Sequence, residues 1–146
     1  MFRMTGARFA AAFALAAALG LYGPLAAQDL KLPEGVTQAM VEEGKTIFHG
    51  PGLCLTCHGQ DATGTPVAPS LTDTTWLNVD GSYEAIINLI NTGVPQPKEG
   101  MMPMLAKGGS EITEEQVRAV AAYVWSLCRV TATSSGGSPD ACTVSK

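Results

Sequence analysis

The sequence predicts a small all-α domain, and three observations lead to that fold class. Two segments, 37–49 and 113–128, space their apolar residues at helical intervals behind a threonine that can cap them. No segment alternates apolar and polar residues in the way a half-buried strand does. The connecting segments are rich in glycine and proline, so we expect long loops between the helices.

The composition limits the chain to one modest domain. Of its 146 residues, 46% are hydrophobic and 15% are charged, which is too apolar for a disordered chain. With 6% aromatic residues, 16 glycines and 9 prolines, the core would gain from a cofactor or a covalent cross-link. The net charge is −4, whereas nucleic-acid binding needs a basic face, so we expect no nucleic-acid partner.

The first 27 residues have the pattern of a secretion signal. Arg3 and Arg8 are the only charges before Asp29, and the apolar segment 9–21 follows them. This segment is too short to cross a bilayer and suits a signal-peptide core, with cleavage expected after Ala27. The alternative is an uncleaved membrane anchor. Cleavage predicts a mature protein in the bacterial periplasm or outside the cell, with no stable membrane insertion.

The first predicted helix follows a polar lead-in over residues 28–35. Thr37 is placed to cap this helix, and the Gly-Pro-Gly sequence at 50–52 ends it. Its apolar face consists of Met40, Val41, Gly44, Ile47 and Phe48. His49, at the end of the helix, is expected to be a surface residue.

The middle of the chain predicts one clear helix. Residues 72–77 are expected to form one or two helical turns, and residues 80–81 a tight turn. Ser82 then caps a helix over 83–91, which Gly93 ends. The chain on either side of these elements has loop composition.

The last helix carries the strongest local signals. Thr113 and Gln116 form a capping box, and Glu114 and Glu115 complement the helix dipole in the first turn. The apolar stripe consists of Val117, Val120, Ala121, Val124, Leu127 and Cys128. After Arg129 the composition changes to threonine, serine, glycine and proline, so residues 131–146 are expected to form a tail.

The chemistry of the chain lies in the motif Cys54-x-x-Cys57-His58. Two cysteines at this spacing on a helical turn point the same way and can add to the two vinyl groups of a haem, which places His58 as the proximal iron ligand. A thioredoxin-like pair needs a βαβ context, and a zinc site needs a second ligand pair at short spacing. A disulfide within so short a loop gains little. We therefore expect one covalently attached haem c with its iron.

Residues 36–130 resemble a class I c-type cytochrome, the small monohaem type of the bacterial periplasm. The segments that carry the resemblance are 44–48, 54–59, 69–71, 101–104 and 121–124. The resemblance implies the cytochrome c fold, in which crossed N- and C-terminal helices and wrapping loops enclose the haem. At Gly44 the two helices could approach closely, and Phe48 and Tyr123 would fill their crossing.

The same resemblance implies roles for three residues around the haem. The carbonyl of Pro69 is expected to accept the ring N–H of His58, which orients that ligand and raises its basicity. Leu71 is expected to pack on the haem. Trp76 lies where the family often has an aromatic residue that reaches a haem propionate with its N–H.

The sixth iron ligand is expected to be a methionine of the loop before the last helix, because a thioether raises the reduction potential and blocks small ligands. In the family this ligand is often followed by proline, which favours Met102. Met104 is the main competitor, because its distance to the glycines at 108–109 matches a common family spacing. Met101 comes third.

Two further cysteines, Cys128 and Cys142, lie outside the haem motif. In an oxidising compartment they are expected to pair and so to tether the tail to the last helix. A closed loop of about 15 residues would contribute roughly 3 kcal/mol. The alternative is that Cys128 is a buried free thiol on the helical stripe.

These expectations describe a periplasmic electron-transfer protein that transforms no substrate and is therefore not an enzyme. Removing residues 1–27 leaves a net charge of −6, which favours redox protein partners with a basic docking face. Residues 95–100 are a candidate docking element. One alternative is a haem subunit of a periplasmic dehydrogenase or oxidase complex. Another is a gas-binding or peroxidase-like haem protein, which needs an open sixth position.

Overall fold

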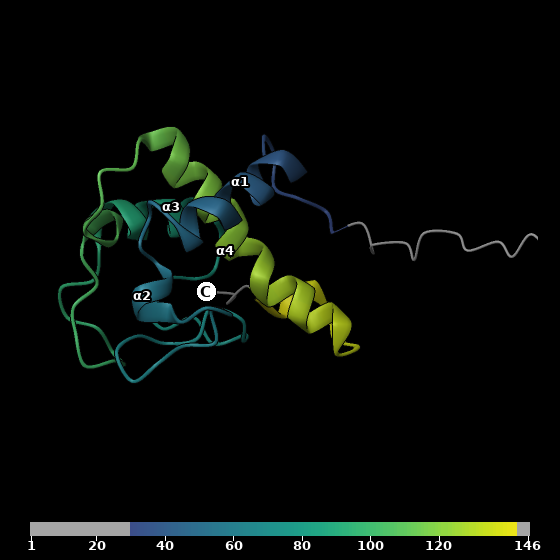
Figure 1. Ribbon diagram of the computed structural model, residues 1–146. Helices are drawn as coiled ribbons and strands as arrows, with labels where there is room; N and C mark the ends of the chain where they lie inside the picture. Colours follow the sequence, from purple (N-terminus) through teal and green to yellow (C-terminus); the bar gives the residue numbers. More distant parts are fainter. Residues whose placement is uncertain (1–29, 143–146) are drawn as a thin grey trace, which may run out of the picture.

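The computed structural model describes residues 30–142 of the chain (Figure 1). The predicted signal sequence, 1–27, lies outside these residues. The elements are α1 (Gln38–His49), α2 (Leu55–His58), α3 (Tyr83–Thr92) and α4 (Glu114–Ser134), with short 3₁₀ turns η1 (Ala106–Gly109) and η2 (Pro139–Cys142). The described residues contain no strand, only an isolated bridge between Val94 and Met104. The all-α fold class is confirmed.

The crossing of α1 and α4 forms the centre of the core (Figure 1). Gly44 lies at the contact, where an added Cβ would overlap the backbone carbonyl of Ala119 and lie 2.9 Å from the Cβ of Tyr123. Beside it, the rings of Phe48 and Tyr123 pack edge-on with centroids 5.4 Å apart. The close helix approach expected at Gly44 is therefore present.

Replacing Gly44 with alanine is expected to destabilise the protein by about 3 kcal/mol, because the new methyl group must force the two helices apart. Urea unfolding followed by circular dichroism measures this loss. The matched control is Glu43→Ala, an exposed position on the same helix, expected to change stability by no more than about 0.5 kcal/mol. Equal stability of both variants would refute the close contact.

The three predicted helix caps are present. The Thr37 hydroxyl accepts the Met40 N–H at 3.2 Å, and the Ser82 hydroxyl accepts the Ala85 N–H at 3.4 Å. Thr113 and Gln116 form the reciprocal capping box, with contacts of 3.3 and 2.9 Å. These side chains satisfy helix N–H groups that have no intrahelical partner, so the helix starts follow from local sequence.

The last helix is longer than predicted. The structure continues α4 to Ser134, whereas the tail was expected to begin at residue 131. The threonine hydroxyls bond back into the helix: Thr131 donates to the Leu127 carbonyl at 3.0 Å, and Thr133 to the Arg129 carbonyl at 2.8 Å. These bonds satisfy the threonine hydroxyls within the helix, so both residues are compatible with the extension.

The helical turns expected over residues 72–77 are absent. There the Ser70 hydroxyl accepts the Thr72 N–H at 3.2 Å, and the Asp73 carboxylate accepts the Thr75 N–H at 2.8 Å. Such bonds between a side chain and the nearby backbone replace the helical pattern, so this prediction was wrong. Among residues 30–142, no helix is both long and apolar enough to span a bilayer.

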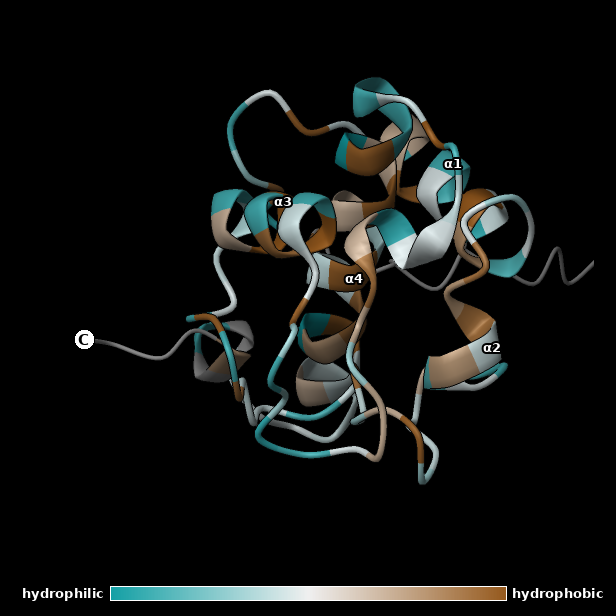
Figure 2. Ribbon diagram, turned by 90° about the vertical axis from the view of Figure 1, so that its left-hand side faces the viewer, coloured by the Kyte–Doolittle hydropathy of each residue, from teal (hydrophilic) through white to brown (hydrophobic). Residues whose placement is uncertain are grey.

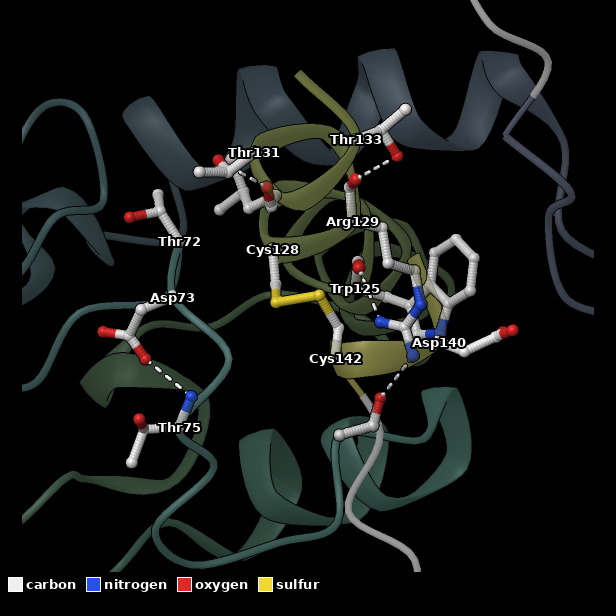
Figure 3. Close-up of a disulfide and its surroundings, with 12 residues drawn as sticks. Thr72, Asp73, Thr75, Trp125, Cys128, Arg129, Thr131, Thr133, Asp140 and Cys142 are labelled. Atoms are coloured by element: carbon white, nitrogen blue, oxygen red, sulfur yellow. Dashed lines mark hydrogen bonds between the residues drawn. A yellow bond between two sulfur atoms is a disulfide. The ribbon is translucent and has the colours of Figure 1, made fainter. Parts of the chain in front are cut away.

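A disulfide joins Cys128 of α4 to Cys142 of η2, as predicted (Figure 3). Both residues are fully buried. Replacing both with alanine is expected to lower the free energy of unfolding by about 3 kcal/mol, because the unfolded chain regains the freedom of the closed loop. Denaturant titration of the variant beside the oxidised wild type measures the change. Coincident unfolding curves would show that the bond adds no stability.

Candidate cofactor site

An apolar cavity of about 290 Å³ lies between α2, α3, α4 and the connecting loops. Figure 2 shows hydrophobic residues interspersed with hydrophilic ones along α3 and α4. The cavity wall includes Phe48 of α1, Ile86 and Ile90 of α3, and Val120 and Val124 of α4. The predicted site residues that line the cavity are Cys54, Cys57, His58, Pro69, Leu71, Trp76, Met102 and Met104.

The two motif cysteines lie one turn apart at the start of α2. The amide N–H groups of Cys57 and His58 both donate to the Cys54 carbonyl, at 3.2 and 3.0 Å, which closes the turn. Both thiols are free. Cys54 is half-buried, and burial raises its thiol pKa to about 11, whereas Cys57 is exposed. The turn thus places two cysteines that form no disulfide at the cavity.

His58 is oriented by a single backbone contact. Its Nδ1 atom lies 2.9 Å from the carbonyl oxygen of Pro69. A carbonyl oxygen only accepts, so Nδ1 carries the proton and Nε2 keeps a lone pair available to a metal. Burial lowers the pKa of His58, and the Pro69 contact partly opposes this effect. The side chain is therefore held as the neutral tautomer that can bind iron.

The three methionines of the following loop differ in position. Met101 is 74% exposed and does not line the cavity. Met104 is partly buried, packs against the core, and is held by its backbone bridge to Val94, with N–O distances of 2.8 and 3.1 Å. Met102 lines the cavity and is 59% exposed. Of the three, Met102 combines access to the cavity with a side chain not packed into the core.

A polar cluster anchors the methionine loop to the helices behind it. The Lys107 ammonium contacts the Glu114 carboxylate at 2.7 Å, and the Asn91 side-chain amide donates to the same carboxylate at 2.9 Å. The hydrogen bonds from Lys107 and Asn91 lower the pKa of Glu114. The cluster joins η1, α3 and the first turn of α4, so it anchors the C-terminal end of the methionine loop.

Trp76 provides the test of whether this cavity suits a haem. Its indole N–H is buried and has no hydrogen-bond partner, while the residue lines the cavity. A buried donor without an acceptor is costly, so this N–H is suited to an acceptor on a bound group. Two free thiols, an oriented imidazole, a thioether and this donor around apolar walls fit a haem with its propionates.

Two residues outside the cavity wall have surroundings that the sequence did not indicate. His49 is partly buried rather than a plain surface residue, with its ring nitrogens 2.7 Å from the Lys45 carbonyl and 2.8 Å from the Gln60 carbonyl. Arg129, for which the sequence indicated no role, is only 4% exposed. Its guanidinium stacks on Trp125, one helical turn earlier. Trp125 and Arg129 are four residues apart on one helix, and this spacing could have indicated their stacking from the sequence.

The comparisons with known proteins agree with this geometry. The family model described as Cytochrome c matches residues 41–128, more than half of the chain. The chain is 41% identical over 96 residues to the cbb3-type cytochrome c oxidase subunit CcoP of Rhodobacter capsulatus, covering 62% of this chain and 30% of that protein. It is 34% identical over 90 residues to the cbb3-type subunit FixP of Rhizobium meliloti, covering 60% and 28%.

The relatives are much longer than this chain. A third, CcoP of Cereibacter sphaeroides, is 36% identical over 91 residues, covering 61% of this chain and 28% of that subunit. The chain thus spans less than a third of the length of the curated relatives it matches. No solved structure matches it significantly. The range that the family model matches, 41–128, includes all the residues that line the cavity.

Proposed function

Because this chain belongs to the cytochrome c family and binds haem c covalently, we propose that it passes single electrons as the haem-bearing component of a periplasmic oxidase complex. The haem supplies one-electron exchange between ferric and ferrous iron. The observation that carries the proposal is the cavity that gathers Cys54, Cys57, His58 and Met102. The names of the relatives, all subunits of cbb3-type oxidases, support the choice of complex.

Each residue has a separate part in holding the group. Each thiol of Cys54 and Cys57 would add across one vinyl group of the haem, with the sulfur bonding to one carbon and the thiol proton passing to the neighbouring carbon. His58 would bind the iron through Nε2, while the Pro69 carbonyl holds its ring. Met102 would supply a thioether ligand to the iron and so leave no open position of the kind that a gas-binding protein needs.

The cavity walls favour rapid electron exchange. The side chains of Ile86, Ile90, Val120 and Val124 give the cavity an apolar wall. Fixed apolar surroundings keep the rearrangement of the protein and solvent around the haem small when the iron changes charge. A histidine–methionine ligand pair suits both oxidation states of the iron. These residues transform no substrate themselves, so the domain relays electrons and any catalysis belongs to its partner.

Two features support a periplasmic location. The predicted signal sequence directs export, and the Cys128–Cys142 disulfide suits an oxidising compartment. The relatives support the subunit alternative better than the freely diffusing carrier that the sequence first favoured. We also propose that the redox partner docks through a basic face on the acidic surface of this chain.

Stopped-flow mixing of the reduced, haem-loaded full chain with a solubilised cbb3-type oxidase tests the proposal. We expect reoxidation that saturates with oxidase concentration, stops in cyanide, and accompanies comigration of the two proteins on a sizing column. Transfer without comigration would favour the diffusing carrier over the subunit. Absence of transfer, with haem present, would contradict both.

A further inference from the structure

The C-terminal segment reaches the region beside the cavity-lining residue Trp76. Gly81 lies between this residue and the end of the described chain. A Cβ built on Gly81 would be 2.5 Å from the Trp76 Nε1 atom and 2.5 Å from the Cys142 carbonyl oxygen. Gly81 therefore has no room for a side chain, and its backbone is in contact with both partners. The 80–81 turn is thus packed directly against the indole and the C-terminal segment.

Arg129 holds this turn from the other side. Its guanidinium donates to the Gly81 carbonyl at 3.3 Å and to the Trp125 carbonyl at 2.9 Å, and lies 3.9 Å from the centre of the Trp125 ring. Burial lowers the pKa of Arg129 to about 10, which still leaves it charged at neutral pH. A buried cation is retained at a cost, and its rigid, forked donors fix the two backbone segments that they join.

The disulfide completes the arrangement (Figure 3). Cys128 precedes Arg129 on α4, and its bond to Cys142 draws η2 against the helix and against Gly81. Asp140 on η2 interacts electrostatically with Arg129. The C-terminal segment after Arg129 thus contacts the residues around the cavity through buried groups.

We infer that Arg129 is a positioning residue: through Gly81, and locked by the Cys128–Cys142 bond, it holds the indole N–H of Trp76 toward a carboxylate of the bound haem. The inference rests on the proposed assignment of the cavity as the haem site. Arg129 does not line that cavity. Its influence on the haem passes through the 80–81 turn and the indole.

The positioned N–H has a defined effect on the iron. A donor that bonds a propionate spreads its negative charge, and this favours the reduced iron over the more positive oxidised iron. Loss of the donor, or of its position, is therefore expected to lower the reduction potential. A side chain that only stabilised the fold would change unfolding and leave the potential of the folded protein unchanged.

A double-mutant cycle on the full haem-loaded chain tests the inference. Reduction potentials are measured by optical titration for wild type, Arg129→Met, Trp76→Phe and the double variant. We expect both single variants to have a lower potential, and the double variant to be no lower than Trp76→Phe alone. Arg118→Met, which removes an exposed charge from the same helix, is the matched control and is expected to leave the potential unchanged.

Two results would overturn the inference. One is an unchanged reduction potential in Arg129→Met. The other is that Arg129→Met lowers the potential of the Trp76→Phe variant as much as it lowers that of the wild type, which would mean that the charge of Arg129 acts on the iron directly. If Arg129→Met does not fold, Arg129→Lys and the Cys128→Ala/Cys142→Ala pair enter the same cycle with the same expectations. Failure of the wild type itself to show covalent haem would instead reject the proposed function.

Discussion

Replacing both Cys54 and Cys57 with serine is expected to abolish covalent haem attachment. A hydroxyl does not replace the thiol in this addition, and the cavity wall offers no other cysteine, because Cys128 and Cys142 are bonded to each other. The wild-type protein, once denatured, should carry the added mass of one haem in its mass spectrum. The double variant should show the mass of the polypeptide alone.

The matched control for this loss is the Cys128→Ala/Cys142→Ala pair. It also removes two sulfurs but is expected to keep the covalently attached haem while it loses stability. Single variants at Cys54 or Cys57 should retain one thioether bond and give an altered reduced spectrum. Retention of covalent haem by the Cys54→Ser/Cys57→Ser variant would refute the assignment of the motif.

Replacing Met102 with alanine is expected to open the sixth iron position. The oxidised variant should lose the weak far-red band that a thioether ligand gives to ferric haem, and the reduced variant should bind carbon monoxide. The reduction potential should fall by a sizeable part of the roughly 0.8 V range that axial ligands control. Absorption spectra and an optical potential titration measure all three effects.

Met104→Ala is the comparison that makes this result decisive. Met104 also lines the cavity, but it packs against the core, and its backbone bridge to Val94 does not depend on its side chain. We expect this variant to keep the far-red band and lose some stability. The opposite outcome, in which Met104→Ala loses the band and Met102→Ala keeps it, would exchange the roles of the two methionines.

Local sequence was sufficient to predict the helix starts and the site motif. Thr37, Ser82 and Thr113 each cap a helix through a hydroxyl that reaches an N–H three residues on. The cysteine spacing likewise depends on a single turn. The contact between His58 and Pro69 spans 11 residues and came from the family resemblance, since no local rule reaches that far.

The features that sequence reasoning missed depend on partners far along the chain. The burial of Arg129 requires the Gly81 carbonyl, 48 positions away, and the contacts of His49 require Gln60. The end of α4 was set too early because serine and threonine count as helix breakers in isolation, whereas here their hydroxyls bond to the preceding turn. Residues 72–77 were predicted to be helical, but the side chains of Ser70 and Asp73 bond to nearby backbone N–H groups there and replace the helical pattern.

The most direct test of the account is the visible spectrum of the reduced wild-type protein before and after carbon monoxide is added. A closed site, with His58 and Met102 on the iron, predicts a low-spin spectrum that the gas leaves unchanged. An immediate spectral change at low gas concentration would reveal an open iron. That result would contradict the electron-transfer account and establish a gas-binding or catalytic haem in its place.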